Sequence, residues 1–108
     1  MTDWDAVREH LALIVMAWIH ESPSPWWFDA WGESQMLYSL WQPDIHSGQF
    51  FMVKDAMRER GWAWHGWEDE SGANVEYWKP GEFHVEYGED LMQANALAAA
   101  EATGYGQE

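Results

Sequence analysis

The segment from Arg58 to Asp90 is rich in carboxylates and tryptophans. A pair of carboxylates is one of the commonest catalytic arrangements. Glu68, Asp69 and Glu70 are adjacent, and glycoside hydrolysis requires two carboxyl groups as acid and base. Three adjacent acids at a hairpin tip are expected to be solvated, whereas a catalytic acid needs surroundings that raise its pKa. We therefore predict no catalytic residue in this segment.

The five histidines show no metal-binding spacing, and none belongs to an H-E-x-x-H arrangement. The chain has no cysteine, which excludes a thiolate metal ligand, a cysteine nucleophile and a disulfide framework. The sequence also contains no phosphate-binding glycine loop, no serine elbow and no triad-like spacing. We predict no metal, no cofactor and no enzymatic activity.

Ten tryptophans suggest either a platform for sugars or a cage for a methylated cation, because indole faces bind both. Most are expected in the core: Trp18 lies on a helical stripe, and Trp62 or Trp64 must face inward by strand alternation. Trp78 is the exception, since it is predicted on a polar strand face beside Glu76. An exposed tryptophan among carboxylates favours an interface anchor over a cage.

The net charge of −14 excludes whole classes of ligand. Direct binding to nucleic acid or to anionic lipid requires a basic footprint, so neither is expected. Ten of the nineteen acidic residues lie from Glu68 onward, where Lys79 is the only lysine or arginine. The simplest interpretation is that this acidity confers solubility, or adaptation to high salt.

A sharper interpretation compares the carboxylates with the phosphates of DNA, which carry one charge per about 1.7 Å of duplex axis. Proteins that bind DNA have basic clefts suited to that density, and an acidic face could occupy such a cleft. The predicted partner-binding residues are Glu68, Asp69, Glu70, Glu76, Trp78, Glu82, Glu86, Glu89 and Asp90. The predicted partner is a host nucleic-acid-binding protein complex with a basic groove.

Three helices and a meander of strands are expected to position these residues. The first helix carries one apolar stripe, made of Trp4, Val7, Leu11, Ile14, Val15 and Trp18. The second follows Pro43–Asp44, ends before Gly61, and carries Ile45, Gln49, Met52, Val53 and Ala56 on one face. The third runs from Leu91 to Ala102, and its alanines permit close packing. A short strand is expected near Gln35–Leu40.

After Gly61 the period becomes that of strands, with runs at 62–67, 73–79 and 82–87 separated by turn residues. In the second run Val75 and Tyr77 are expected to face the core, opposite Glu76 and Trp78. In the third run, three side chains are predicted to be buried: Phe83, Val85 and Tyr87. The alternate ones are predicted to be exposed: Glu82, His84 and Glu86.

Residues 1–108 have the length of one ordinary domain. The predicted fold class is α+β, a single-domain α-β-α sandwich with three helices and an antiparallel sheet of three or four strands. The apolar run Leu11–Ile19 is far shorter than the roughly 20 residues that span a bilayer. It also lacks the flanks of a signal peptide. A soluble protein of the reducing cytoplasm, without membrane contact, is therefore expected.

The order of these elements and several motifs resemble the phage ABA-sandwich domain family. The resemblance rests on "VMAW" late in the first helix, "WQPDIHSGQFFMVKDAMRERGW" through the second, "NVEYWK" in the sheet, and the acidic turn before "QANALAAAEA" of the third helix. Family members usually carry a small hydroxyl residue after the proline, where this chain has Asp44. The resemblance implies a phage or prophage origin and an α/β sandwich, and it implies no general activity.

The leading functional hypothesis is a phage-encoded binding protein that inhibits a host nucleic-acid-binding defence complex, as anti-CRISPR proteins do, with nucleic-acid mimicry as the candidate mechanism. One alternative is an accessory or structural phage protein whose acidity serves solubility only. Another is a carbohydrate-binding module that uses exposed tryptophans. The sequence leaves the target, the stoichiometry and the oligomeric state open.

Overall fold

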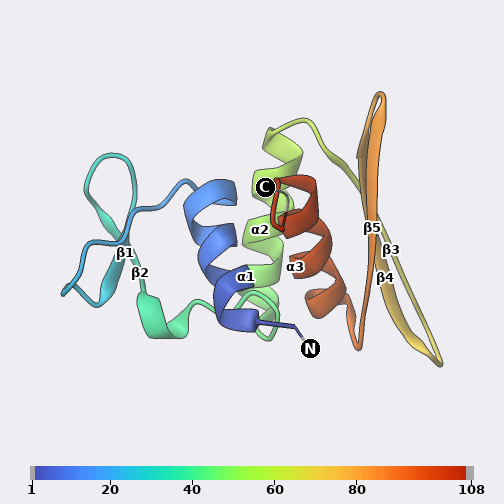
Figure 1. Ribbon diagram of the computed structural model, residues 1–108, viewed down its shortest axis with the longest axis horizontal. Coiled ribbons are helices and arrows are strands. Elements are labelled where there is room, and N and C mark those ends of the chain that lie inside the picture. Colours follow the sequence, from blue (N-terminus) through green and yellow to red (C-terminus); the bar gives the residue numbers. More distant parts are fainter. Residues whose placement is uncertain (1, 107–108) are drawn as a thin grey trace.

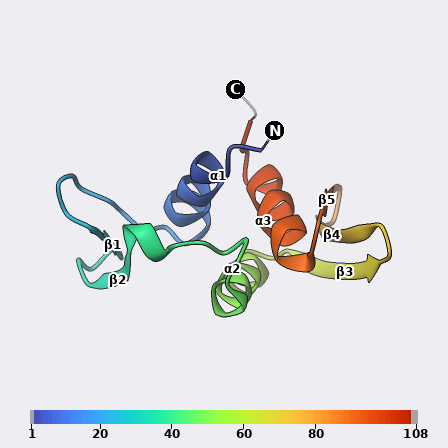
Figure 2. The same ribbon diagram turned by 90° about the horizontal axis from the view of Figure 1, so that it is seen from below.

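The computed structural model describes residues 2–106; residues 1, 107 and 108 of the predicted domain lie outside this range. Three helices lie between a two-stranded hairpin and a three-stranded sheet (Figure 1 and Figure 2). The helices are α1 (Trp4–His10), α2 (Ser47–Glu59) and α3 (Leu91–Ala102). The strands are β1 (Trp26–Phe28), β2 (Ser34–Leu37), β3 (Ala63–Asp69), β4 (Gly72–Lys79) and β5 (Glu82–Gly88). The predicted α+β class is confirmed. The layer order differs from the predicted α-β-α sandwich, because the helices lie between two sheets, and the strand expected near Gln35–Leu40 belongs to the separate hairpin (Figure 1).

The β4–β5 turn sets the register of the last strand. Only Pro80–Gly81 separates the two strands, and Lys79 pairs with Glu82. Gly81 has a φ of 84°, a conformation that glycine adopts without steric cost. Residues that pair across two strands point to the same face, so Trp78 and Phe83 share a face of the sheet.

Helix α3 packs on the other face, because small side chains allow it to come close. Asp90 caps its first turn, with Oδ1 accepting a hydrogen bond from the backbone N–H of Gln93 at 2.9 Å. Its buried alanines are Ala94, Ala96, Ala98, Ala99 and Ala100. Beneath the helix, β5 ends at buried Gly88, where a Cβ would lie 2.6 Å from the backbone nitrogen of Ala94. A larger residue at Gly88 would push the helix off the sheet.

A buried amide joins α3 to the inner face of the sheet. Val75 and Tyr77 are fully buried, which confirms their predicted orientation. The Tyr77 hydroxyl donates a hydrogen bond to Oδ1 of Asn95 at 2.5 Å, and Nε1 of Trp64 donates to the same oxygen at 3.1 Å. Burial raises the pKa of Tyr77 far above its ordinary value, so the phenol keeps the proton that it donates.

The predicted faces of β5 are wrong. Three side chains expected in the core are exposed: Phe83, Val85 and Tyr87. His84 and Glu86, expected to be exposed, are half-buried on the α3 side, whereas Glu82 is exposed as predicted. The reason is the register with β4, which pairs Tyr77 with His84 and Val75 with Glu86. Because Val75 and Tyr77 face the core, the β5 residues opposite them must face it too.

Helix α1 continues into η1 (Leu11–Val15), a single π-helical turn. Val15 and Trp18 are buried, as predicted, but Ile14 is exposed. The wider π turn rotates the residues that follow Leu11 around the helix axis, so the predicted stripe does not continue through Ile14. Within residues 2–106, none of the helices is both long and apolar enough to cross a membrane.

Helix α2 begins at Ser47, later than predicted, and Ile45 is exposed before it. Its buried residues are Phe50, Val53 and Met57. Asp44 is buried, because the guanidinium of Arg8 donates to both of its oxygens, from Nε at 2.7 Å and from Nη2 at 2.8 Å. This bidentate pair ties α1 to the segment that precedes α2.

We predict that Trp18→Ala lowers the free energy of unfolding by about 3 to 5 kcal/mol. Trp18 is 5% exposed and packs edge to face on Trp41, with ring centroids 4.8 Å apart. The matched control is Trp31→Ala, because Trp31 is 87% exposed and its loss should change stability by less than about 0.5 kcal/mol. Urea unfolding followed by circular dichroism measures both, and equal losses would contradict the assignment of Trp18 to the core.

Candidate functional site

The face of the three-stranded sheet that points away from the helices is the candidate site, and we call it the outer sheet face. The antiparallel register brings alternate residues of β3, β4 and β5 side by side on it. Its main members are His65, Trp67, Asn74, Glu76, Trp78, Phe83, Val85 and Tyr87. All three helices lie on the opposite side of the sheet (Figure 1), so no helix of residues 2–106 covers this face.

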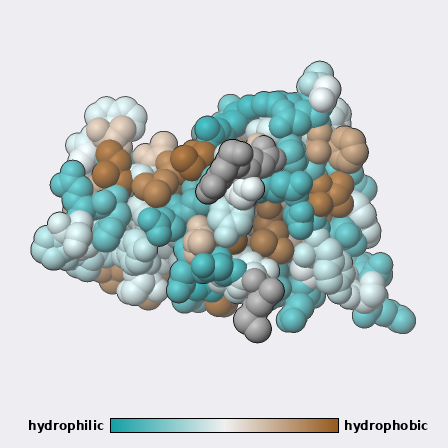
Figure 3. Space-filling view, in the orientation of Figure 1, coloured by the Kyte–Doolittle hydropathy of each residue, from teal (hydrophilic) through white to brown (hydrophobic). Residues whose placement is uncertain are grey.

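Five large apolar side chains of the outer sheet face are open to solvent: Trp67, Trp78, Phe83, Val85 and Tyr87. Their exposed fractions run from 39% for Trp67 and Val85 to 70% for Phe83. Figure 3 shows hydrophobic residues (brown) among hydrophilic ones (teal) at the right, over the strands of this sheet. Single apolar residues are ordinary on protein surfaces, whereas a contiguous exposed group marks a place where something binds.

Contacts within the outer sheet face hold the rings of His65, Trp67 and Tyr87 in place. The Tyr87 hydroxyl donates a hydrogen bond to the carbonyl oxygen of Ser71, in the turn between β3 and β4. The Tyr87 ring lies over Gly72, whose φ of 137° and missing side chain leave room for it. The rings of His65 and Trp67 lean on each other with centroids 5.0 Å apart. Rings that are already held in position lose little side-chain entropy on binding.

The structure divides the nine predicted partner-binding residues among three places. Glu76 and Trp78 lie together on the outer sheet face, as predicted. Five others surround the end of the sheet where β3 and β5 finish, and we call them the acidic end: Glu68, Asp69, Glu70, Glu89 and Asp90. Glu82 and Glu86 lie on the face opposite to that of Glu76. Glu76, Glu82 and Glu86 therefore do not form the single acidic face that the sequence predicts.

The acidic end combines local structural roles with exposed charge. Oδ1 of Asp69 accepts hydrogen bonds from Oγ of Ser71 at 2.6 Å and from its backbone N–H at 2.8 Å. These bonds lower the pKa of Asp69, so the carboxylate stays charged. Asp90 caps α3, and the remaining acids of the group are exposed. The acidic end thus concentrates negative charge next to Trp67 and Tyr87 of the outer sheet face.

A second group of ionisable side chains, missed by sequence reasoning, lies between β5 and α3. His84 places Nε2 3.0 Å from Oε1 of Glu82 and Nδ1 3.5 Å from Oε1 of Glu101. A hydrogen bond with Glu101, burial and the Glu101 charge together raise the pKa of Glu86 from 4.5 to about 7. The Glu86 carboxyl therefore exchanges its proton near neutral pH. Within the described residues, no three His, Asp or Glu side chains are arranged to hold a metal ion.

Comparison of the chain with protein-family models, curated proteins and solved structures gives no match. The resemblance to the phage ABA-sandwich domain family therefore stays a prediction from the sequence. What the protein binds must be inferred from the outer sheet face, the acidic end and the net charge.

We predict that Glu86→Gln stabilises the protein at alkaline pH and not at acidic pH. The pKa of Glu86 is higher in the folded protein than in the unfolded chain, so folding favours its protonated form. Its contribution to stability is complete below its ordinary pKa of 4.5 and is lost as the pH rises through about 7. Glutamine imitates the protonated carboxyl at every pH. The melting temperatures of parent and variant should therefore agree at about pH 4 and differ at about pH 9.

Glu70→Gln is the control for this pH dependence, because Glu70 is exposed in the β3–β4 turn. It should keep the pH profile of the parent. A gap between parent and Glu86→Gln that is the same at every pH would show that the carboxyl pair shares no proton.

Proposed function

We propose that this is a binding protein that docks through its outer sheet face onto a positively charged surface of a partner protein. The observation that carries the proposal is the group of exposed aromatic side chains on a sheet face that no helix of residues 2–106 covers, in a protein of net charge −14. Tryptophan and tyrosine are frequent among the residues that dominate binding energy, and Trp67, Trp78 and Tyr87 are available for this role. The acidic end beside them selects a basic partner and repels an acidic one.

The partner class we propose is a host nucleic-acid-binding defence complex, and the protein inhibits it in the host cytoplasm as anti-CRISPR proteins do. A groove that binds nucleic acid is lined by lysine and arginine to match the phosphate charge density. The carboxylates of the acidic end are suited to enter such a groove, while the aromatic rings anchor the protein at its margin. The resemblance of the sequence to phage proteins agrees with this proposal, which requires no catalytic turnover.

A carbohydrate-binding function is the second candidate, because flat sheet faces with exposed aromatic rings also suit sugars. Trp67, Trp78 and Tyr87 present ring surface on which the apolar faces of sugar rings can stack. Neutral sugars gain nothing from the surrounding carboxylates, so this candidate leaves the charge unexplained. The basic protein partner accounts for both the rings and the charge.

We predict that the double substitution Trp78→Ser with Phe83→Ser weakens partner binding by at least about 30-fold, since interface hot spots contribute about 2 kcal/mol or more. The matched control is Trp31→Ser with Leu40→Ser, which removes two exposed apolar side chains from another part of the surface. The immobilised parent protein first captures partners from nuclease-treated host lysate, and mass spectrometry identifies them. Affinities for the purified partner are then compared, together with thermal unfolding to verify the fold.

Competition and charge reversal separate the proposed function from its alternatives. DNA or RNA should compete with the protein for the partner, and Glu68→Lys with Glu70→Lys should slow association most at low salt. Capture of the same proteins by the parent and by the Trp78/Phe83 double variant, without competition from nucleic acid, would leave solubility as the reason for the charge. Binding of soluble oligosaccharides by the parent but not by this variant would support the carbohydrate module.

A further inference from the structure

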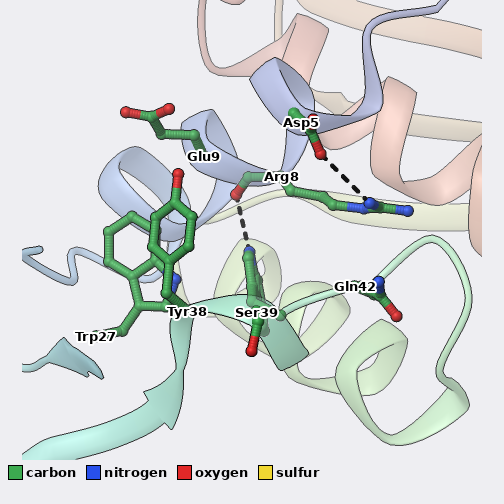
Figure 4. A pocket seen from close by; sticks show the side chains of 8 residues that line it. Asp5, Arg8, Glu9, Trp27, Tyr38, Ser39 and Gln42 are labelled. Carbon is green, nitrogen blue, oxygen red and sulfur yellow. Dashed lines mark hydrogen bonds and ion pairs between the residues drawn. The ribbon is translucent and has the colours of Figure 1, made fainter. Parts of the chain in front are cut away.

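A pocket of about 250 Å³ lies at the opposite end of the molecule from the outer sheet face, between α1 and the segment that follows the β1–β2 hairpin. Asp5, Arg8 and Glu9 of α1 line one side of it (Figure 4). Aromatic residues line the other side: Trp27, Tyr38 and Trp41. Sites for drug-sized ligands measure about 300 to 1,000 Å³, so this pocket suits a smaller molecule.

The aromatic side of the pocket is built from packed rings. Tyr38 stacks on Trp27, with ring centroids 5.1 Å apart and planes inclined by 23°. His20 packs against both rings, at 4.5 Å from Tyr38 and 5.4 Å from Trp27. Trp41 is buried, and its Nε1 donates a hydrogen bond to the carbonyl oxygen of Arg8 at 2.8 Å. The rings are therefore fixed before any ligand arrives.

The charge around the pocket is negative in spite of Arg8. Both ends of the Arg8 guanidinium are engaged by Asp44, and its Nη1 lies 3.7 Å from Oδ1 of Asp5. Among the charged residues that line the pocket, Arg8 is the one cation, and it is paired with Asp44 and Asp5 and not with Glu9. Figure 4 shows the Tyr38 hydroxyl pointing toward α1, on the side of Glu9. Burial first, and then the charges of Glu9 and Asp5, raise the pKa of Tyr38.

We propose that this pocket binds a small alkyl-substituted ammonium ion, held by the aromatic ring of Tyr38 and by the carboxylate of Glu9. Trp27, which is 1% exposed, supports the Tyr38 ring on which the ion rests. The face of a phenol ring attracts such cations, and the alkyl groups of the cation fit an apolar wall. Anions are repelled, because the carboxylates of Asp5 and Glu9 line the pocket and its one guanidinium, that of Arg8, is already paired with Asp44. The same chemistry is carried by a free quaternary amine and by a methylated lysine side chain.

The test is an NMR titration of the ¹⁵N-labelled protein with choline, observing the indole N–H signals of Trp27 and Trp41. The neutral isostere 3,3-dimethylbutan-1-ol has the same shape without the charge. A short peptide with one trimethyllysine, compared with the unmodified peptide, distinguishes a protein side chain from a free amine as the ligand. We expect choline or the trimethyllysine peptide to shift both signals, and the neutral alcohol to bind at least about tenfold more weakly.

Substitutions assign the binding to the pocket. Tyr38→Leu and Glu9→Gln should each weaken choline binding by about fivefold, whereas Tyr38→Phe retains the ring and should bind within about twofold of the parent. Glu70→Gln removes a distant exposed carboxylate and serves as the control for net charge. Equal binding of choline and the neutral alcohol would overturn the proposal, as would equal losses for Glu9→Gln and Glu70→Gln. Failure of both cations to shift the two signals would overturn it as well.

Discussion

The shared acceptor at Asn95 is the interaction on which the arrangement of the sheet depends. One amide oxygen on α3 accepts hydrogen bonds from Tyr77 of β4 and from Trp64 of β3, in surroundings where an unpaired hydroxyl would be costly. Inverting the sheet would break both bonds and would remove Val75 from the core. Once this face of β4 points inward, the two-residue turns fix the register of β3 and β5 and therefore which of their side chains point inward. The exposed aromatic face is therefore a direct consequence of the buried amide.

In strand β5 the apolar side chains face solvent and the polar ones face the helices, which is the reverse of the usual arrangement. Its polar residues His84 and Glu86 lie on the α3 side, while Phe83, Val85 and Tyr87 face solvent. A carboxyl group whose pKa is raised to about 7 shows that the inner side of this arrangement opposes ionisation. Conflicts between local pattern and global fold concentrate at functional sites, where binding compensates for them. The reversed strand is thus an independent reason to regard the outer sheet face as a binding surface.

Local patterns were sufficient to predict α3 from Leu91 to Ala102, the three strands of the meander and the exposure of Trp78. The error in β5 was avoidable, since a two-residue Pro80–Gly81 turn places Trp78 and Phe83 on one face. The long-range pair of Arg8 with Asp44, and that of Glu86 with Glu101, depend on the packing of distant segments. Local sequence patterns do not predict such pairs. The acidic surface that was predicted from strand alternation alone is divided between the two faces of the sheet.

The net charge bears on what can cover the outer sheet face. A second copy of the chain would bring another −14 charges against the first, with the acidic ends of both copies close to the interface. Self-repulsion of this kind keeps strongly charged proteins monomeric and soluble. A basic partner removes the repulsion and adds long-range attraction, which speeds association before the aromatic rings make contact. Charge and apolar area, which conflict in a dimer of this protein, act together in a complex with a cationic partner.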